Sequence, residues 1–118
     1  MNRDSEREGQ MNYEDQSIEL QVLARAHEII SECGWRQGSF GNPRTGYCLE
    51  GALYAAEWDV EGVYAAWRSE EFLSKWVGEM GFENIVEWND APERTELDVL
   101  DLLAAARTRL AEREGETK

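Results

Sequence analysis

Cys48 is the side chain in this sequence best suited to nucleophilic chemistry. It lies in GYCLEGA, residues 46–52, where a glycine-bearing loop is predicted to become a helix. The N-terminus of a helix lowers the pKa of a thiol and can present it for attack. A thiol enzyme also needs a base, for which the single histidine, His27, is the candidate, with Asn89 or Asp90 to orient it. Nothing in the spacing brings these residues together, and the alternative is that Cys48 is a small buried residue at the base of a central helix.

The loop at residues 35–47 is a candidate site for a small anion such as a nucleotide. Arg36 and Arg44 flank its glycines, and the helix predicted to follow begins near Cys48 with unpaired backbone N–H groups. Trp35 and Trp88 would supply stacking surfaces. The loop lacks both the lysine ending of a P-loop and the G-x-G-x-x-G pattern, and its glycines equally suit a tight turn.

Aromatic residues outside the helical stripes could line a pocket for a flat ligand. Those at helical spacing are assigned to the core instead. One histidine and two isolated cysteines show no metal-ligand spacing, so we expect neither a metal nor a cofactor. The pocket candidates are Trp35, Phe40, Tyr47 and Trp88, and the core aromatics are Trp67, Phe72 and Trp76.

The outward faces of two predicted helices, at residues 69–80 and 95–110, carry regularly placed acids. Such rows can imitate the phosphates of a nucleic acid, as an acidic DNA mimic does, or can bind a protein partner with a basic surface. The same rows are typical of a solvated helix face. The acids assigned to a partner-binding surface are Glu70, Glu71, Glu79, Glu93, Glu96, Asp98 and Asp101.

The first helix that must position these residues is predicted at 18–33. Gly34 suits the left-handed conformation that ends many helices. An Asn-Pro turn signal between glycines then predicts a loop or short hairpin at 35–47. The apolar residues of this helix that recur at helical spacing are Ile18, Val22, Ala26, Ile29, Ile30 and Cys33.

A central helix is predicted to follow Cys48, with Leu49, Leu53 and Ala56 as its apolar stripe. Gly51 and the nearby alanines keep another side of this helix small, which would let a neighbouring helix approach closely. We therefore expect this helix in the middle of the fold.

Two further helices are predicted from their capping residues. Asp59 can cap a short helix, and Ser69 can cap the next one, which ends at Gly81. Their apolar faces are Val60, Val63, Tyr64 and Trp67, and then Phe72, Leu73, Trp76, Val77 and Met80.

The segment at 82–90 suits either a short strand or one helical turn, and we favour the helical turn. Thr95 and Asp98 have the spacing of a capping box, with Asp in place of the usual Glu. They predict a final helix whose apolar positions are Val99, Leu103, Ala106 and Leu110.

These elements predict an all-α or mostly α fold, a compact bundle of about four helices with a short hairpin or loop between the first two. Residues 17–112 are expected to form a single helical domain. A flexible acidic tail at 1–16 would precede it, and a frayed C-terminus at 113–118 would follow it.

Charge limits the partners that this chain can bind. Its 118 residues include 25 acidic and 12 basic side chains, for a net charge of −13. This charge disfavours direct binding to nucleic acids and to anionic membranes, and it favours cationic protein surfaces. The N-terminus lacks the apolar region of a signal peptide, and no apolar run could span a membrane. With only two cysteines, a cytoplasmic location is expected.

Three segments carry a resemblance to a known family: GWRQG at 34–38, CLEGA at 48–52 and WNDAPERT at 88–95. Their order and spacing resemble small uncharacterised proteins of actinobacteria and their phages, which share the pattern G-W-x-Q-G, C-L-x-G-A, and W-N-D followed by R-T. The resemblance extends from Ser17 to the neighbourhood of Leu110, and no activity is established for that family. It implies that one constellation contains Gly34, Trp35, Gln37, Gly38, Cys48, Gly51, Trp88, Asn89, Asp90, Arg94 and Thr95.

The sequence therefore favours a small acidic, non-enzymatic binding protein, an accessory protein of a phage or mobile element that engages a host protein. The alternatives are a small-ligand binder that uses the loop at 35–48, an acidic DNA mimic, and a cysteine-dependent enzyme. The ligand-binding set joins the loop candidates to the motif residues, and it consists of Trp35, Arg36, Gln37, Arg44, Cys48, Trp88, Asn89, Asp90 and Arg94.

Overall fold

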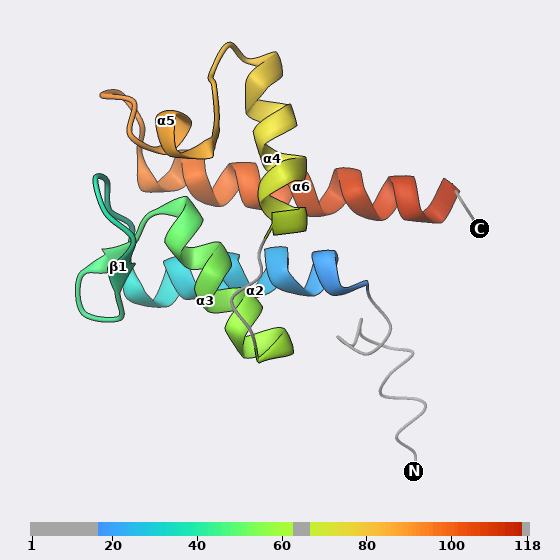
Figure 1. The fold of residues 1–118 in the computed structure, drawn as a ribbon, viewed down its shortest axis with the longest axis horizontal. Helices are drawn as coiled ribbons and strands as arrows, with labels where there is room; N and C mark the ends of the chain where they lie inside the picture. The colour runs from blue at the N-terminus through green and yellow to red at the C-terminus, as the bar shows by residue number, and fades with distance from the viewer. Residues whose placement is uncertain (1–16, 63–66, 117–118) are drawn as a thin grey trace.

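The computed structural model describes residues 17–62 and 67–116, which form five helices and one two-stranded hairpin. The fold is mostly helical, as predicted, and the hairpin lies between the first two of these helices. The predicted tail at 1–16 lies outside the described residues. The elements are α2 (Ile18–Cys33), β1 (Gly41–Asn42), β2 (Gly46–Tyr47), α3 (Leu49–Glu61), α4 (Trp67–Glu79), α5 (Ile85–Asn89) and α6 (Glu96–Glu116) (Figure 1).

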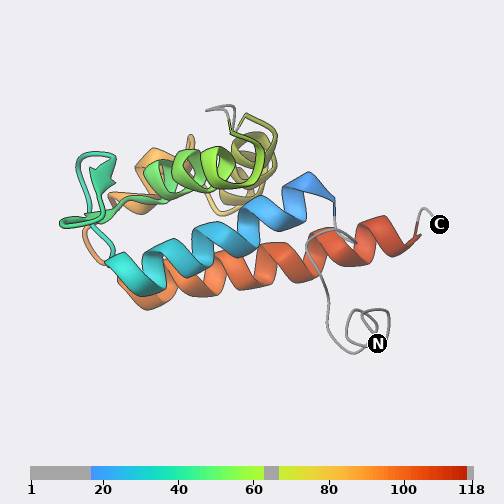
Figure 2. The ribbon, with the colours of Figure 1, turned by 90° about the horizontal axis from the view of Figure 1, so that it is seen from below.

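The helices form two layers. α2 and α6 run side by side in opposite directions, and α3 and α4 lie on one side of this pair (Figure 2). α2 packs most extensively, against both α3 and α6, so its apolar face must be broad. The largest fully buried apolar side chains are Val22, Leu23 and Ile30 of α2, Leu49 and Leu53 of α3, Leu73 and Val77 of α4, Ile85 of α5, and Val99 and Leu103 of α6.

Local capping explains where two of these helices begin. The hydroxyl of Ser17 accepts a hydrogen bond from the backbone N–H of Leu20 at 3.2 Å, which starts α2. The predicted capping box before α6 is confirmed. The N–H of Thr95 donates to Oδ2 of Asp98 at 3.0 Å, and the N–H of Asp98 donates to Oγ1 of Thr95 at 3.1 Å. α6 then continues past Leu110 to Glu116.

The hairpin packs against the start of α3. Asn42 pairs with Gly46 across the hairpin, and the N–H of Cys48 donates to the carbonyl of Phe40 at 3.2 Å. A Cβ atom at Gly51 would overlap that same carbonyl of Phe40, so only glycine fits there. Gly51 therefore makes room for the hairpin, whereas the sequence had predicted room for a neighbouring helix.

The predicted cap at Asp59 is wrong, because α3 continues through it and ends at Gly62, which has a φ of 78°. Asp59 instead accepts a hydrogen bond from Nε of Arg25 in α2 at 2.8 Å. Val60 belongs to α3, and residues 63–66 and the side chain of Trp67 lie outside the described part of the chain. The rest of the predicted apolar face, Val63, Tyr64 and Trp67, therefore lies outside the described side chains.

Ser69 is not a cap either, since α4 begins two residues earlier at Trp67 and buries Ser69 within it. The apolar face of α4 is otherwise as predicted, with Leu73 and Val77 fully buried. Met80 is the exception, because it follows the last helical residue and is 48% exposed. The favoured helical turn at 82–90 is confirmed by α5. No helix among the described residues is long and apolar enough to cross a bilayer.

Candidate functional site

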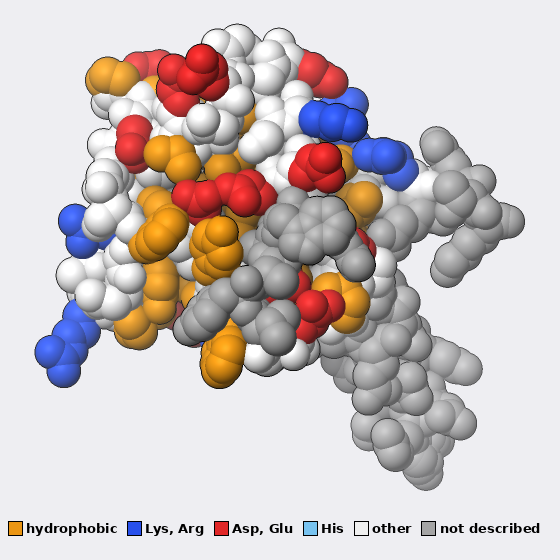
Figure 3. Space-filling model, viewed as in Figure 1, with side chains coloured by type: hydrophobic (Ala, Val, Ile, Leu, Met, Phe, Trp, Pro, Cys, Tyr) orange, Lys and Arg blue, Asp and Glu red, His pale blue; other side chains and the backbone are white. Residues whose placement is uncertain are grey.

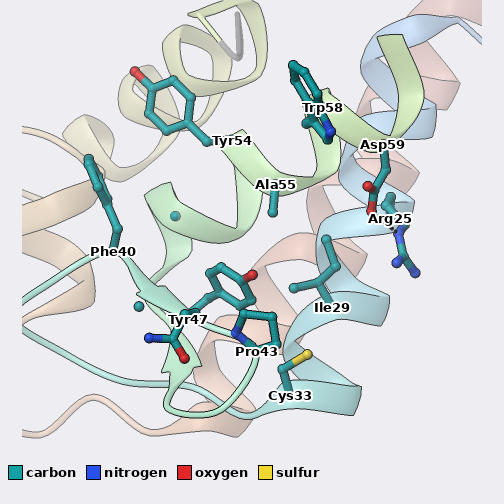
Figure 4. A pocket seen from close by; sticks show the side chains of 13 residues that line it. Arg25, Ile29, Cys33, Phe40, Pro43, Tyr47, Tyr54, Ala55, Trp58 and Asp59 are labelled. Atoms are coloured by element: carbon teal, nitrogen blue, oxygen red, sulfur yellow. Dashed lines mark hydrogen bonds and ion pairs between the residues drawn. The ribbon is translucent and has the colours of Figure 1, made fainter. Parts of the chain in front are cut away.

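An open groove of about 670 Å³ lies between the hairpin, α2 and α3. Figure 4 shows Tyr54 and Trp58 projecting from successive turns of α3, with Phe40 and Tyr47 coming from the hairpin side. The groove is also lined by Pro43, Ile29, Cys33, Ala55 and the Arg25–Asp59 pair. We call this surface the aromatic groove.

Large aromatic side chains of the groove are open to solvent. Phe40 is 56% exposed and Trp58 is 49% exposed. Phe40 packs edge-on against Tyr54, with 5.7 Å between ring centroids. Figure 3 shows hydrophobic side chains gathered over the hairpin and α3, with acidic side chains among them. Exposed aromatic side chains around a hollow are a common feature of binding sites.

The three motif segments meet at a different place, around the side chain of Asn89. Asn89 is only 1% exposed, and its Oδ1 accepts from the indole N–H of Trp35 at 2.7 Å and from the N–H of Leu49 at 2.9 Å. Its Nδ2 donates to the carbonyl of Arg36 at 3.2 Å and to Oδ1 of Asp90 at 2.9 Å. One amide thus ties α5 to the loop before the hairpin and to the start of α3.

Gln37 and Arg94 extend this arrangement, which we call the Asn89 network. Nε2 of Gln37 donates to the carbonyls of Asn89 and Ala91, at 3.0 and 2.8 Å. Nε of Arg94 donates to the carbonyl of Trp88 at 2.7 Å, and its guanidinium lies 4.0 Å from the centroid of the Trp88 ring. The predicted ligand residues Trp35, Gln37, Trp88, Asn89, Asp90 and Arg94 are therefore brought together, and their hydrogen-bonding groups bind one another.

Cys48 adjoins the Asn89 network and is buried, with 8% of its surface exposed. Its Sγ accepts a hydrogen bond from the N–H of Gly51 at 3.2 Å, so the thiol caps α3. Burial raises the pKa of the Cys48 thiol, and the backbone hydrogen bonds from Gly51 and Glu50 only partly oppose this effect. The prediction that Cys48 is a buried residue at the base of a helix is confirmed. The expectation that this helix is the central one is wrong, because α2 packs against more of the fold than α3 does.

His27 stands in α2 and lines neither the aromatic groove nor the smaller cavity of about 330 Å³ beside Cys48. Asp90 lines that smaller cavity with Cys48, and its Oδ1 accepts from the N–H of Gly38 at 3.1 Å. Cys48 and Asp90 therefore line the same cavity, and His27 does not line it. Within residues 17–62 and 67–116, no group of His, Cys, Asp and Glu side chains is arranged to hold a metal ion.

The first backbone N–H groups of α3 already have partners, so few remain to bind an anion. The N–H of Leu49 is bound to Asn89, and those of Glu50 and Gly51 are bound to the Cys48 thiol. Arg44 lies at the exposed hairpin tip. Nε of Arg36 is buried without a hydrogen-bond partner among the described residues.

Glu50 and Glu70 form a hydrogen-bonded pair of carboxyl groups between α3 and α4. Two carboxyl groups can share a hydrogen bond only if one of them is protonated. The hydrogen bond to Glu70, together with burial, raises the pKa of Glu50 to about 7. Glu50 therefore keeps its proton to near neutral pH.

The other acids assigned to a partner surface do not form one continuous row. Glu79 lies 4.0 Å from Arg109, and Asp98 takes part in the capping box and lies 3.9 Å from Arg94. Glu71, Glu93, Glu96 and Asp101 are exposed, and they are distributed over α4, the loop before α6, and α6.

Sequence reasoning placed Phe40 and Tyr47 in an aromatic pocket correctly but missed Tyr54 and Trp58. A signal was present, because these two residues are four apart and lie off the Leu49–Leu53–Ala56 stripe. Trp35 and Trp88 were proposed for the same pocket, and they lie in the Asn89 network instead.

The chain belongs to a family of unknown function, DUF6197, whose sequence profile matches residues 16–109. The matched range contains both the aromatic groove and the Asn89 network. Comparisons with curated proteins and with solved structures gave no match.

Proposed function

We propose that this member of the DUF6197 family is a non-enzymatic binding protein, and that its aromatic groove takes an apolar or aromatic side chain of a protein partner. The observation that carries the proposal is the half-exposure of Phe40 and Trp58 beside a groove of about 670 Å³. Covering these rings would remove additional apolar area from water, at about 25 cal/mol per Å². Tryptophan and tyrosine in such pockets are frequent hot spots of protein interfaces.

Charge supports a partner with a basic surface. The chain carries a net charge of −13. Arg25, the cation in the groove lining, is already paired with Asp59 and Glu28. A cationic partner would therefore meet a complementary field, which speeds association and excludes acidic competitors. The resemblance to phage and actinobacterial proteins leads us to include a host protein as the partner in this proposal.

The alternatives have weaker support from the geometry. A cysteine-dependent enzyme would need a reactive thiolate, whereas burial raises the pKa of Cys48. A small-anion site at the start of α3 would have to displace Asn89 or the thiol from the backbone N–H groups. A DNA mimic would need a regular row of unpaired acids, whereas Glu79 and Asp98 have basic neighbours.

A peptide-display selection against the full chain tests the proposal. Random peptides are selected on the wild-type protein, and the selected peptides are then measured against Trp58→Ala and Leu97→Ala. Leu97 is the matched control because it is a large apolar side chain, 64% exposed, on α6 rather than in the groove. Circular dichroism melting of each variant confirms that it is folded.

We expect selected peptides to share an aromatic or large apolar anchor. Their affinity should fall at least about tenfold for Trp58→Ala, as for a hot-spot residue worth more than 1.4 kcal/mol, and should be unchanged for Leu97→Ala. Peptides that bind all three proteins equally would overturn the proposal, as would a selection that yields no peptide. Concentration-dependent dimers that dissociate in Trp58→Ala would also overturn it, because the groove would then bind a second copy.

A further inference from the structure

The carboxyl pair of Glu50 and Glu70 lies at the Tyr54 end of the aromatic groove. Tyr54 lines the groove, and the charges of Glu70 and Glu50, after burial, contribute to raising the pKa of its phenol. Phe40 gives a second link, because it lines both the groove and the smaller cavity that Glu50 lines. The exposed ring of Phe40, the half-buried ring of Tyr54 and two acids therefore adjoin at one end of the groove.

Among the described side chains, the titratable groups near this carboxyl pair are acidic or neutral. Tyr54 faces it from α3, and the thiol of Cys48 lies within electrostatic reach of both Glu50 and Asp90. The ion pairs of the described residues involve Arg25, Arg94 and Arg109, and none of them includes either member of the carboxyl pair. The opposite end of the groove differs, because Asp59 is neutralised there by Arg25.

We infer that the partner segment carries a Lys or Arg beside its aromatic or apolar anchor, and that this cation lies at the Tyr54 end of the groove, against Glu50 and Glu70. The inference rests on the proposed function of the groove and names the chemistry of its occupant. An exposed cation over an aromatic ring, and an ion pair at a partly exposed site, each contribute modestly, and together they correspond to about a threefold to tenfold gain in affinity.

Binding of this cation is linked to a proton. Glu50 holds its proton below neutral pH and is ionised above it. A cation placed beside the pair favours the ionised form and so releases the proton. The preference for a cationic segment therefore grows as the pH rises through the pKa of Glu50, which is about 7.

Three acetylated and amidated peptides test the inference: Ala-Lys-Trp-Lys-Ala, the same peptide with norleucine for both lysines, and the same peptide with glutamate for both. Norleucine keeps the length of the side chain and removes its charge. Affinities for the full chain are measured by NMR from the shifts of ¹⁵N-labelled protein, including the indole N–H of Trp58, at pH 5.5 and pH 8.5. Glu50→Gln and Glu70→Gln keep the size of each side chain, and Glu71→Gln, an exposed acid on α4, is the control.

At pH 8.5 the lysine peptide should bind about threefold to tenfold more tightly than the norleucine peptide, with the glutamate peptide weakest. The advantage should shrink at pH 5.5, and Glu50→Gln and Glu70→Gln should each remove this pH dependence while Glu71→Gln keeps it. Equal binding of the lysine and norleucine peptides in the groove would sink this inference and leave the proposed function standing. An advantage that persists unchanged in Glu50→Gln would sink it too. If no peptide shifts the NMR signals of the groove residues, the inference is refuted. The display selection then tests separately whether the groove binds a protein partner.

Discussion

Replacement of Asn89 by alanine should destabilise this protein far more than a typical asparagine substitution. The change leaves the buried N–H of Leu49 without a partner, and it removes the acceptor of the Trp35 indole and the donor to the Arg36 carbonyl. A buried unsatisfied group costs about 1–3 kcal/mol, and each of the other two hydrogen bonds contributes about 0.5–1.5 kcal/mol because water can partly replace them. The expected loss in the free energy of unfolding is therefore about 2–6 kcal/mol.

Asn84 provides a matched control in the same short helix. Its side chain caps α5 by accepting from the N–H of Glu87 at 2.9 Å, and it is exposed. Loss of such a cap costs about 1 kcal/mol. Urea unfolding of Asn89→Ala, Asn84→Ala and the wild type, followed by tryptophan fluorescence and by circular dichroism, gives the two differences directly. Equal losses in the two variants would refute the reasoning, because Asn89 would then be no more than a local cap.

A second substitution separates the acceptor of Asn89 from its donor. Asn89→Asp keeps an oxygen for Trp35 and Leu49 but loses the Nδ2 donor, and it places a second carboxyl next to Asp90. We expect a loss smaller than that of Asn89→Ala at acid pH, growing as the new carboxyl ionises beside Asp90. A loss that does not change with pH would show that the two side chains are not in contact.

Further outcomes follow from the same contacts. Gly51→Ala should cost about 1–3 kcal/mol, because its Cβ would overlap the carbonyl of Phe40; a neutral result in urea unfolding would mean that the hairpin packs elsewhere. The pKa of Glu50 is about 7 in the folded protein, against 4.5 in an unfolded chain, so its contribution to stability is full below pH 4.5 and is lost as the pH rises towards 7. Urea unfolding from pH 5 to 8 should show this decline, and Glu50→Gln should reduce it; an identical profile in the variant would contradict the pairing with Glu70. Iodoacetamide should modify Cys48 slowly at pH 7.5, because burial raises its pKa, and rapid modification would reopen the question of a catalytic thiol.

Local signals in the sequence were sufficient for the helices whose patterns are regular. The apolar spacing from Val22 to Ile30 and the glycine at 34 define α2, and Thr95 with Asp98 defines the start of α6. Each of these features involves residues within a few positions of one another, so no tertiary information was needed to predict them.

Asp59 shows where local signals fail. Aspartate is a good N-cap, but it is also tolerated within a helix, and its role here is decided by Arg25, 34 positions earlier in the chain. The predicted cap at Ser69 is wrong for a related reason. α4 begins at Trp67, and the sequence before Trp67 shows no clear helix-start signal. The role of Asp59 therefore depends on a contact that the sequence pattern does not display.

The candidate site was only partly predictable for the same reason. Tyr54 and Trp58 can be placed on one face of α3 from their spacing, but only the fold brings Phe40 and Tyr47 of the hairpin beside them. The resemblance grouped Trp35, Gln37 and Asn89 correctly, yet it could not say whether they form an open site. Their mutual hydrogen bonds indicate a structural role.

The modification rate of Cys33 tests the central claim, that the aromatic groove is the binding surface, most directly. Cys33 lines the groove and is half-buried, and the buried Cys48 is an internal reference in the same molecule. A peptide from the display selection, at a saturating concentration, should slow iodoacetamide modification of Cys33 and leave that of Cys48 unchanged. An unchanged rate at Cys33 with the peptide bound would contradict the claim, because the peptide would then bind outside the groove.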